Sequence, residues 1–165
     1  MPTWTCAFYG FVALVTFLPM LFVWSVWHLA RTRGWSWIRP DTRNMYVDGA
    51  KTLITASGIA VALLASSSVA SAKTAVPLVA FSAKVAAVSL ISCVVFSLVL
   101  ILGLLRGFEL SWSRNNEGRI AAGQEPAEDG KLNTSELTFI LLPAGAALSS
   151  FLVGFVFLGR IAFHF

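Results

Sequence analysis

Charged side chains are scarce in this sequence, and their scarcity limits the class of protein. Asp, Glu, Lys and Arg make up 12% of the 165 residues, whereas hydrophobic residues make up 57%. A soluble globular domain carries about 25% charged residues, roughly twice this fraction. The composition therefore excludes an ordinary soluble domain and is typical of a protein with several membrane-spanning helices.

Cysteine and histidine, which build disulfide scaffolds and metal centres, are also rare. Cys6 and Cys93 lie in apolar sequence, where a thiol serves as a small hydrophobic side chain. His28 ends the first apolar run and His164 lies at the carboxyl terminus, so the predicted membrane separates them and they cannot share a metal ion or haem within one chain. No HExxH, GxSxG, CxxC or phosphate-loop motif is present. We therefore expect no enzyme activity and no cofactor.

The sequence contains four apolar runs, and none of them contains a charged side chain. The two shortest contain 21 residues, which span about 31 Å as a helix and match the roughly 30 Å hydrocarbon core of a bilayer. A signal peptide is a poorer interpretation of the first run, because no basic segment precedes it. We predict an all-α polytopic membrane protein in which residues 1–165 form a single domain of four transmembrane helices. The predicted spans are residues 6–30, 52–72, 85–105 and 137–159.

Lys84 interrupts the apolar sequence just before the third run. A buried functional lysine would need an acidic partner at the same depth, and no predicted span contains an acidic residue. Long lysine side chains near helix ends reach back to the headgroups. We therefore predict that Lys84 marks the membrane boundary. Residues 73–83 are then expected to form a short apolar loop or interfacial segment, in which Pro77 discourages a continuous helix.

The cationic residues predict the orientation. The linker 31–51 holds five Lys or Arg residues and the linker 106–136 holds four, so nine of the twelve fall on one side of a four-span protein. The positive-inside rule assigns that side to the cytoplasm and both termini to the opposite side. The chain has twelve Lys and Arg residues against eight Asp and Glu residues. Because topology already explains where these cations lie, we expect no direct nucleic-acid binding. The predicted location is a bacterial inner membrane.

Helix-start signals occur in both cytoplasmic linkers. Asn133 followed three residues later by Glu136 resembles a capping box directly before the fourth run. Pro40, Asp41 and Thr42 indicate that the second helix begins several residues before the membrane. The first linker is therefore expected to be partly helical.

Small residues at four-residue spacing mark the faces along which helices approach closely in lipid. Such stripes in the second, third and fourth runs predict that these helices pack on one another or on copies of the chain in a homo-oligomer. The first run is filled with Phe, Trp, Leu and Met and is expected to face lipid or lie at the periphery. The predicted packing residues are Gly58, Ala62, Ser66, Ala70, Ser89, Cys93, Ser97, Ala146, Ser150 and Gly154.

Serine hydroxyls offer a second interpretation of the same helices. A hydroxyl in a membrane helix either bonds a carbonyl of its own helix, joins neighbouring helices, or lines a water-filled path. An oligomeric pore or channel-like effector is therefore an alternative function. Its predicted lining residues are Ser57, Ser66, Ser67, Ser68, Ser89 and Ser97.

The two linkers carry the remaining polar chemistry. Basic residues of the first linker are suited to anionic lipid headgroups. An acidic cluster in the second linker would be repelled by those lipids and suits a soluble cytoplasmic protein. The predicted contact residues are Arg31, Arg33, Arg39 and Arg43 in the first linker, and Glu125, Glu128 and Asp129 in the second.

The absence of reactive groups in the spans and the concentration of polar sequence on one face favour a non-enzymatic membrane protein. We expect a homo-oligomeric anchor or sensor that recruits or regulates a cytoplasmic partner. Bacterial defence or toxin immunity is suggested by class analogy alone. Besides the pore, an accessory subunit of a larger membrane complex is the weaker alternative.

Overall fold

The protein is all-helical apart from one two-stranded pairing. The computed structural model describes residues 2–33, 37–38, 40–71, 77–127 and 130–162. Within the described residues, each of the four predicted apolar runs lies in a separate helix, and four helices are long and apolar enough to cross a membrane. The helices are α1 (Pro2–Arg33), α2 (Pro40–Ser71), α3 (Pro77–Ala121) and α4 (Thr134–Ala162), and the strands are β1 (Trp37–Ile38) and β2 (Gly130–Lys131).

Three of the four helices, α1, α2 and α3, have proline as their first residue. α2 begins at Pro40 and α3 begins at Pro77, because proline has a helical φ and lacks the N–H that a first-turn residue leaves unpaired. The predicted early start of α2 is thus confirmed. The prediction of a loop over 73–83 is wrong for residues 77–83, which belong to α3, since Pro77 initiates the helix; residues 73–76 lie outside the described residues.

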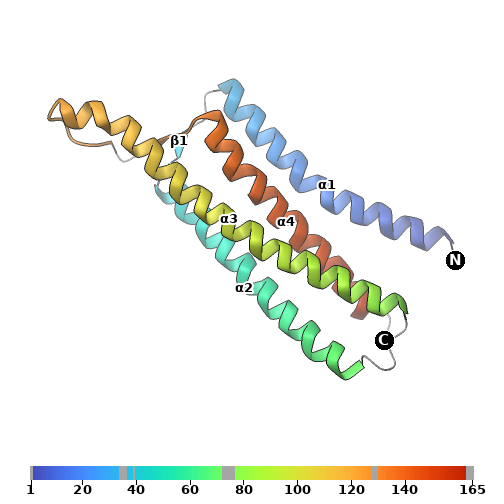
Figure 1. Cartoon of the computed structure of the whole chain (residues 1–165). Helices are drawn as coiled ribbons and strands as arrows, with labels where there is room; N and C mark the ends of the chain where they lie inside the picture. Colours follow the sequence, from blue (N-terminus) through green and yellow to red (C-terminus); the bar gives the residue numbers. More distant parts are fainter. Residues whose placement is uncertain (1, 34–36, 39, 72–76, 128–129, 163–165) are drawn as a thin grey trace.

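The four helices form an open row and not a closed bundle (Figure 1). α3 and α4 make the most extensive contact, α1 packs on α4, and α2 packs mainly on α3. α1 and α2 are therefore the two edges of the row. The peripheral position expected for the Phe- and Trp-rich first run agrees with this arrangement, and large side chains such as Phe17 and Phe22 of α1 are exposed.

Two apolar clusters hold the row together. The first cluster joins α2, α3 and α4 near the linkers, and the second joins α2, α3 and α4 towards the opposite end, with partly buried side chains of α1 against it. The first contains Ala50, Leu100, Leu104, Leu132 and Ile140. The second contains Ala60, Leu64, Ala86, Leu90 and Phe157.

The two linkers meet at one end of the molecule, which we call the linker end. β1 and β2 pair antiparallel, with Trp37 opposite Lys131 and Ile38 opposite Gly130. A chain with four consecutive spans must place its first and third linkers together, and this pairing agrees with that expectation. Figure 1 shows β1 beside the start of α4, with the amino terminus of α1 far from it.

Candidate functional site

α3 continues as a helix well past the apolar run that ends at residue 105. Residues 106–121 extend it by about 24 Å at 1.5 Å per residue. The helix ends at Ala121 and is followed by Gly123, whose φ is 70° and whose N–H donates to the Ile120 carbonyl at 3.0 Å. The Gln124 N–H donates to the Arg119 carbonyl at 2.9 Å. These two bonds form a Schellman motif, and the positive φ suits glycine.

Beyond Gly123 the chain turns back along the helix. We call residues 106–127 the arm, and Figure 1 shows its tip projecting past the starts of α2 and α4. The prediction of a long linker over 106–136 is therefore refined, because its first half is helix. The arm is the largest structural element at the linker end that sequence reasoning did not identify.

Asn116 fixes the returning segment against the helix. Its side chain is fully buried. Asn116 Oδ1 accepts from the Ala127 N–H at 2.7 Å, and its Nδ2 donates to the carbonyls of Ala127 and Trp112, each at 3.1 Å. Arg119 Nε adds a bond to the Glu125 carbonyl at 3.0 Å. A buried amide with its partners satisfied holds a defined conformation, so the arm is a preorganised element.

A charged contact joins the arm to the start of α4. Arg114 forms an ion pair with Glu136 Oε1, and Glu136 Oε2 accepts from the Asn133 N–H at 2.7 Å. The second bond is the returning half of a capping box, so the predicted helix start at Asn133 and Glu136 is confirmed. The Glu136 carboxylate therefore contacts both Arg114 of the arm and the Asn133 N–H at the start of α4, and it links these two elements.

The outer surface of the arm combines an exposed apolar side chain with charges of both signs. Ile120 is 54% exposed near the tip. Three charged residues within five positions of Ile120 in the sequence are also exposed: Glu117, Arg119 and Glu125. The arm carries three arginines and three glutamates and is therefore balanced in charge: Arg106, Arg114, Arg119, Glu109, Glu117 and Glu125.

The basic residues predicted to contact lipid pack partly on aromatic rings. The Arg31 guanidinium lies 5.3 Å from the Trp27 ring centroid, and that of Arg43 lies 4.4 Å from the Phe108 centroid. Among the acidic candidates, Glu125 is exposed on the arm. The side chains of the other predicted contact residues lie outside the described part of the chain: Arg33, Arg39, Glu128 and Asp129. Their contacts with lipid or with a partner stay predictions.

Three of the six predicted packing residues of α3 and α4 are buried inside the row. Cys93 and Ser97 are fully buried, and Gly154 packs closely under Leu90. Ser89, Ala146 and Ser150 are half-buried.

The predicted stripe of α2 faces outward. Gly58, Ala62 and Ser66 are exposed, and the side chain of Ala70 lies outside the described residues. α2 instead buries Ala50, Ser57, Ala60 and Leu64 against its neighbours. The seven-residue spacing of positions 50, 57 and 64 is the sequence signal that would have identified this face.

The serines proposed as pore lining do not share one surface of the chain. Ser57 and Ser97 are fully buried, Ser89 is half-buried, and Ser66 is exposed and donates to the Leu63 carbonyl at 2.8 Å. The side chains of Ser67 and Ser68 lie outside the described residues. A pore would therefore require contacts between several copies.

No cluster of three or more His, Cys, Asp or Glu side chains suited to a metal ion occurs among the described residues. The structural features that remain as a candidate site are the arm and the adjoining surface of α3 and α4. No family model, no curated protein and no solved structure matches the chain.

Proposed function

We propose that the protein is a non-enzymatic integral membrane anchor whose arm recruits or regulates a soluble cytoplasmic protein. The four helices cross the membrane, the linker end is cytoplasmic, and both termini lie on the other side. We assign it to a bacterial inner membrane, and a role in defence or immunity follows the class analogy given above.

The arm is the observation that carries this proposal. A short loop is enough to connect two antiparallel helices. α3 instead extends by residues 106–121, ends in a Schellman motif and holds its return segment through Asn116. An ordered projection that is longer than connectivity needs is suited to binding, because little conformational entropy is lost when a partner docks.

The surface of the arm suits a protein partner. Interfaces combine apolar anchor side chains with a polar rim. Ile120, at 54% exposure, supplies the anchor, and Glu117, Arg119 and Glu125 supply the rim. A charge-balanced arm is also less attracted to an anionic membrane surface than a basic arm would be.

The exposed stripe of α2 supports self-association as part of the same function. A Cβ atom built at Gly58 would meet nothing within 4 Å, so this face is open in the single chain. In lipid, small residues at this spacing permit close approach of two helices. We propose that α2 joins copies of the chain and thereby presents several arms together.

The test is isolation of the protein from its native membrane directly into nanodiscs, followed by mass measurement and identification of bound proteins. Wild type is expected to carry a stoichiometric soluble partner. Ile120→Glu is expected to lose most of it, about tenfold, because a charge replaces the apolar anchor. Ile59→Glu, at a 58% exposed position on α2 outside the arm, is the matched control and should retain the partner.

The same isolation separates the alternatives. A closed homo-oligomer with no soluble protein, together with ion flux in liposomes that falls when Ser66 is changed to Leu, would favour the pore. Integral membrane proteins present in fixed ratio would favour the accessory subunit. Retention of the soluble partner by Ile120→Glu would show that the arm is not the docking element.

A further inference from the structure

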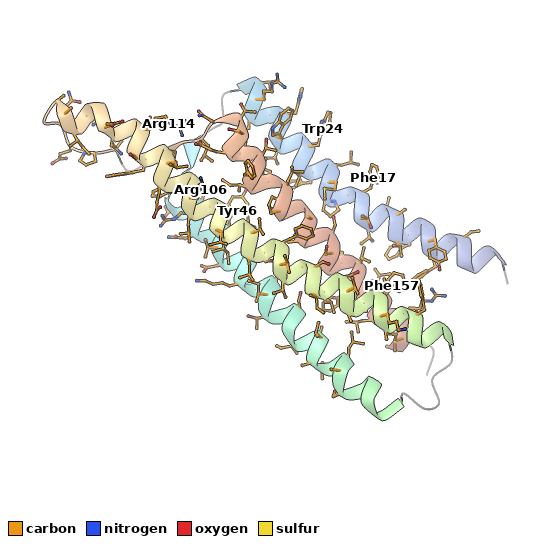
Figure 2. All side chains as sticks on the ribbon, in the orientation of Figure 1. Phe17, Trp24, Tyr46, Arg106, Arg114 and Phe157 are labelled. Carbon is orange, nitrogen blue, oxygen red and sulfur yellow. The ribbon has the colours of Figure 1, made fainter. Side chains whose placement is uncertain are left out.

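A groove of about 450 Å³ lies between α3 and the first turns of α4. It opens to the outside of the row beside the base of the arm. Arg106 and Arg114, labelled in Figure 2, lie at this end of α3, with Phe157 far along the row. The groove is lined by Val99, Leu102, Gly103, Arg106, Gly107, Leu110, Ser135, Glu136 and Phe139.

The groove changes from apolar to polar along its length. Leu102 and Phe139 are 66% and 74% exposed and belong to the apolar runs of α3 and α4. Arg106 directly follows the α3 run, and Ser135 lies in the first turn of α4. From Val99 to Arg106 the helix rises about 10 Å. A ligand that fits this surface therefore needs a polar head and an apolar tail.

The charge at the polar end is positive. The two carboxylate oxygens of Glu136 are already bound by Arg114 and by the Asn133 N–H. Within the described residues, Arg106 forms no ion pair and no hydrogen bond with another side chain. Arg106 and Glu136 are the charged residues that line the groove, and Glu136 is neutralised by Arg114 while the exposed Glu109 lies outside the lining, so Arg106 is the unpaired charge there. The amino-terminal end of α4 adds the positive end of its helix dipole. The groove is thus complementary to an anion.

We propose that this groove binds one anionic phospholipid, with its phosphate on Arg106 and the Ser135 hydroxyl and an acyl chain along Val99, Leu102 and Phe139. The inference rests on the membrane location proposed above but not on the arm's protein partner. Guanidinium groups bind phosphate through paired charge-assisted hydrogen bonds. Basic pockets between membrane helices on the cytoplasmic side are suited to such headgroups.

The position of the groove favours a lipid over a soluble anion or a second copy of the chain. Arg106 stands where the charge-free run 85–105 ends, which is the headgroup level of the proposed membrane. The apolar walls continue into the exposed α3 surface at Val95 and Leu98. A soluble phosphate would leave those walls unused, and a helix from another copy would bury Arg106 without an anion.

The first test compares lipids that differ only in the headgroup. The purified full-length protein in mild detergent is titrated with phosphatidylglycerol or with phosphatidylcholine of the same acyl chains, and bound lipid is counted by native mass spectrometry. Wild type is expected to prefer phosphatidylglycerol, and Arg106→Gln to bind it roughly tenfold more weakly. Lys51→Gln removes another exposed cation, on α2, and should leave the preference intact.

The second test blocks the apolar part of the groove. Val99→Trp fills it and is expected to lower phosphatidylglycerol binding by a similar factor, whereas Val88→Trp, at an exposed position elsewhere on α3, should not. Circular dichroism melting checks that each variant is folded. Arg106→Gln changes a polar contact and Val99→Trp an apolar one, so either variant tests the site if the other misfolds.

Several results would overturn the proposal. An unchanged headgroup preference in Arg106→Gln would show that Arg106 does not bind the phosphate. An equal loss of phosphatidylglycerol binding in Lys51→Gln would indicate diffuse charge attraction. Displacement of the lipid by millimolar glycerol 3-phosphate would mean that the headgroup binds without the chain. If the wild-type protein is a dimer and takes up lipid only after it dissociates, the groove is occupied by a second copy of the chain.

Discussion

α4 and α2 carry similar small residues at similar spacing, yet use them differently. In α4, a Cβ atom built at Gly154 would lie 2.7 Å from Leu90 Cγ, and one built at Gly145 would lie 2.7 Å from Val23 Cγ2. In α2, a Cβ atom at Gly58 would meet nothing within 4 Å. Figure 1 shows the reason: α4 lies between α1 and α3, whereas α2 is at an edge of the row.

The difference teaches what a stripe of small residues encodes. The stripe specifies a face that another backbone can approach closely. It does not specify whether the approaching helix belongs to the same chain. That choice depends on the order of helices in the row, which no local spacing contains. The following predictions test whether α4 uses its small residues to pack on helices of the same chain, and whether α2 uses its stripe to pack on another copy.

The largest effect is expected for Gly154→Ala. The new methyl group overlaps Leu90, and overpacking of this kind costs about 1–3 kcal/mol of unfolding free energy. Gly58→Ala adds the same methyl group to open space and should gain up to about 1 kcal/mol, because alanine favours the helical backbone more than glycine does. Unfolding in mixed micelles, followed by circular dichroism, measures both. Equal losses would mean that the two faces do not differ in packing.

An intermediate effect is expected for Ala62→Leu on the exposed stripe of α2. The larger side chain should reduce self-association several-fold, because it keeps two α2 helices apart. The unfolding free energy of the single chain should not change, since Ala62 is exposed. Crosslinking in liposomes at several protein-to-lipid ratios measures the association. An unchanged dimer fraction would assign self-association to another surface.

The smallest effect is expected for Ser149→Ala. Ser149 Oγ donates to the Thr16 carbonyl of α1 at 3.1 Å, and hydrogen bonds between membrane helices are worth about 0.6 kcal/mol on average. Ser66→Ala is its control, because Ser66 bonds only a carbonyl of its own helix in the described structure. A loss of unfolding free energy in Ser66→Ala as large as in Ser149→Ala would contradict the distinction.

The sequence predicted the helices well because run length and charge are local signals. All four runs fall in the expected helices, and the starts at Pro40 and Asn133–Glu136 follow capping chemistry. The arm was missed because residues 106–121 mix charged and apolar side chains and look like a linker. Gly123 and the absence of proline between 106 and 121 were the available signals.

The rest of the candidate site could not be read from local sequence. The bond between Asn116 and Ala127 and the ion pair of Arg114 with Glu136 join residues that only the fold brings together. The pairing of β1 with β2 involves two residues in each strand, which is too short for a periodic pattern. The groove at Arg106 likewise depends on how α3 and α4 cross.

The contact between α1 and α4 has a consequence for synthesis. α1 leaves the ribosome before α4 does, but α4 is the helix on which it packs: Trp27 Nε1 donates to Thr138 Oγ1 at 3.1 Å, and Phe8 lies edge-on to Phe157 with ring centroids 5.4 Å apart. α1 therefore lacks its main packing partner until α4 has been synthesised. A chain cut short before α4 would leave α1 without its partner and visible to quality-control proteases.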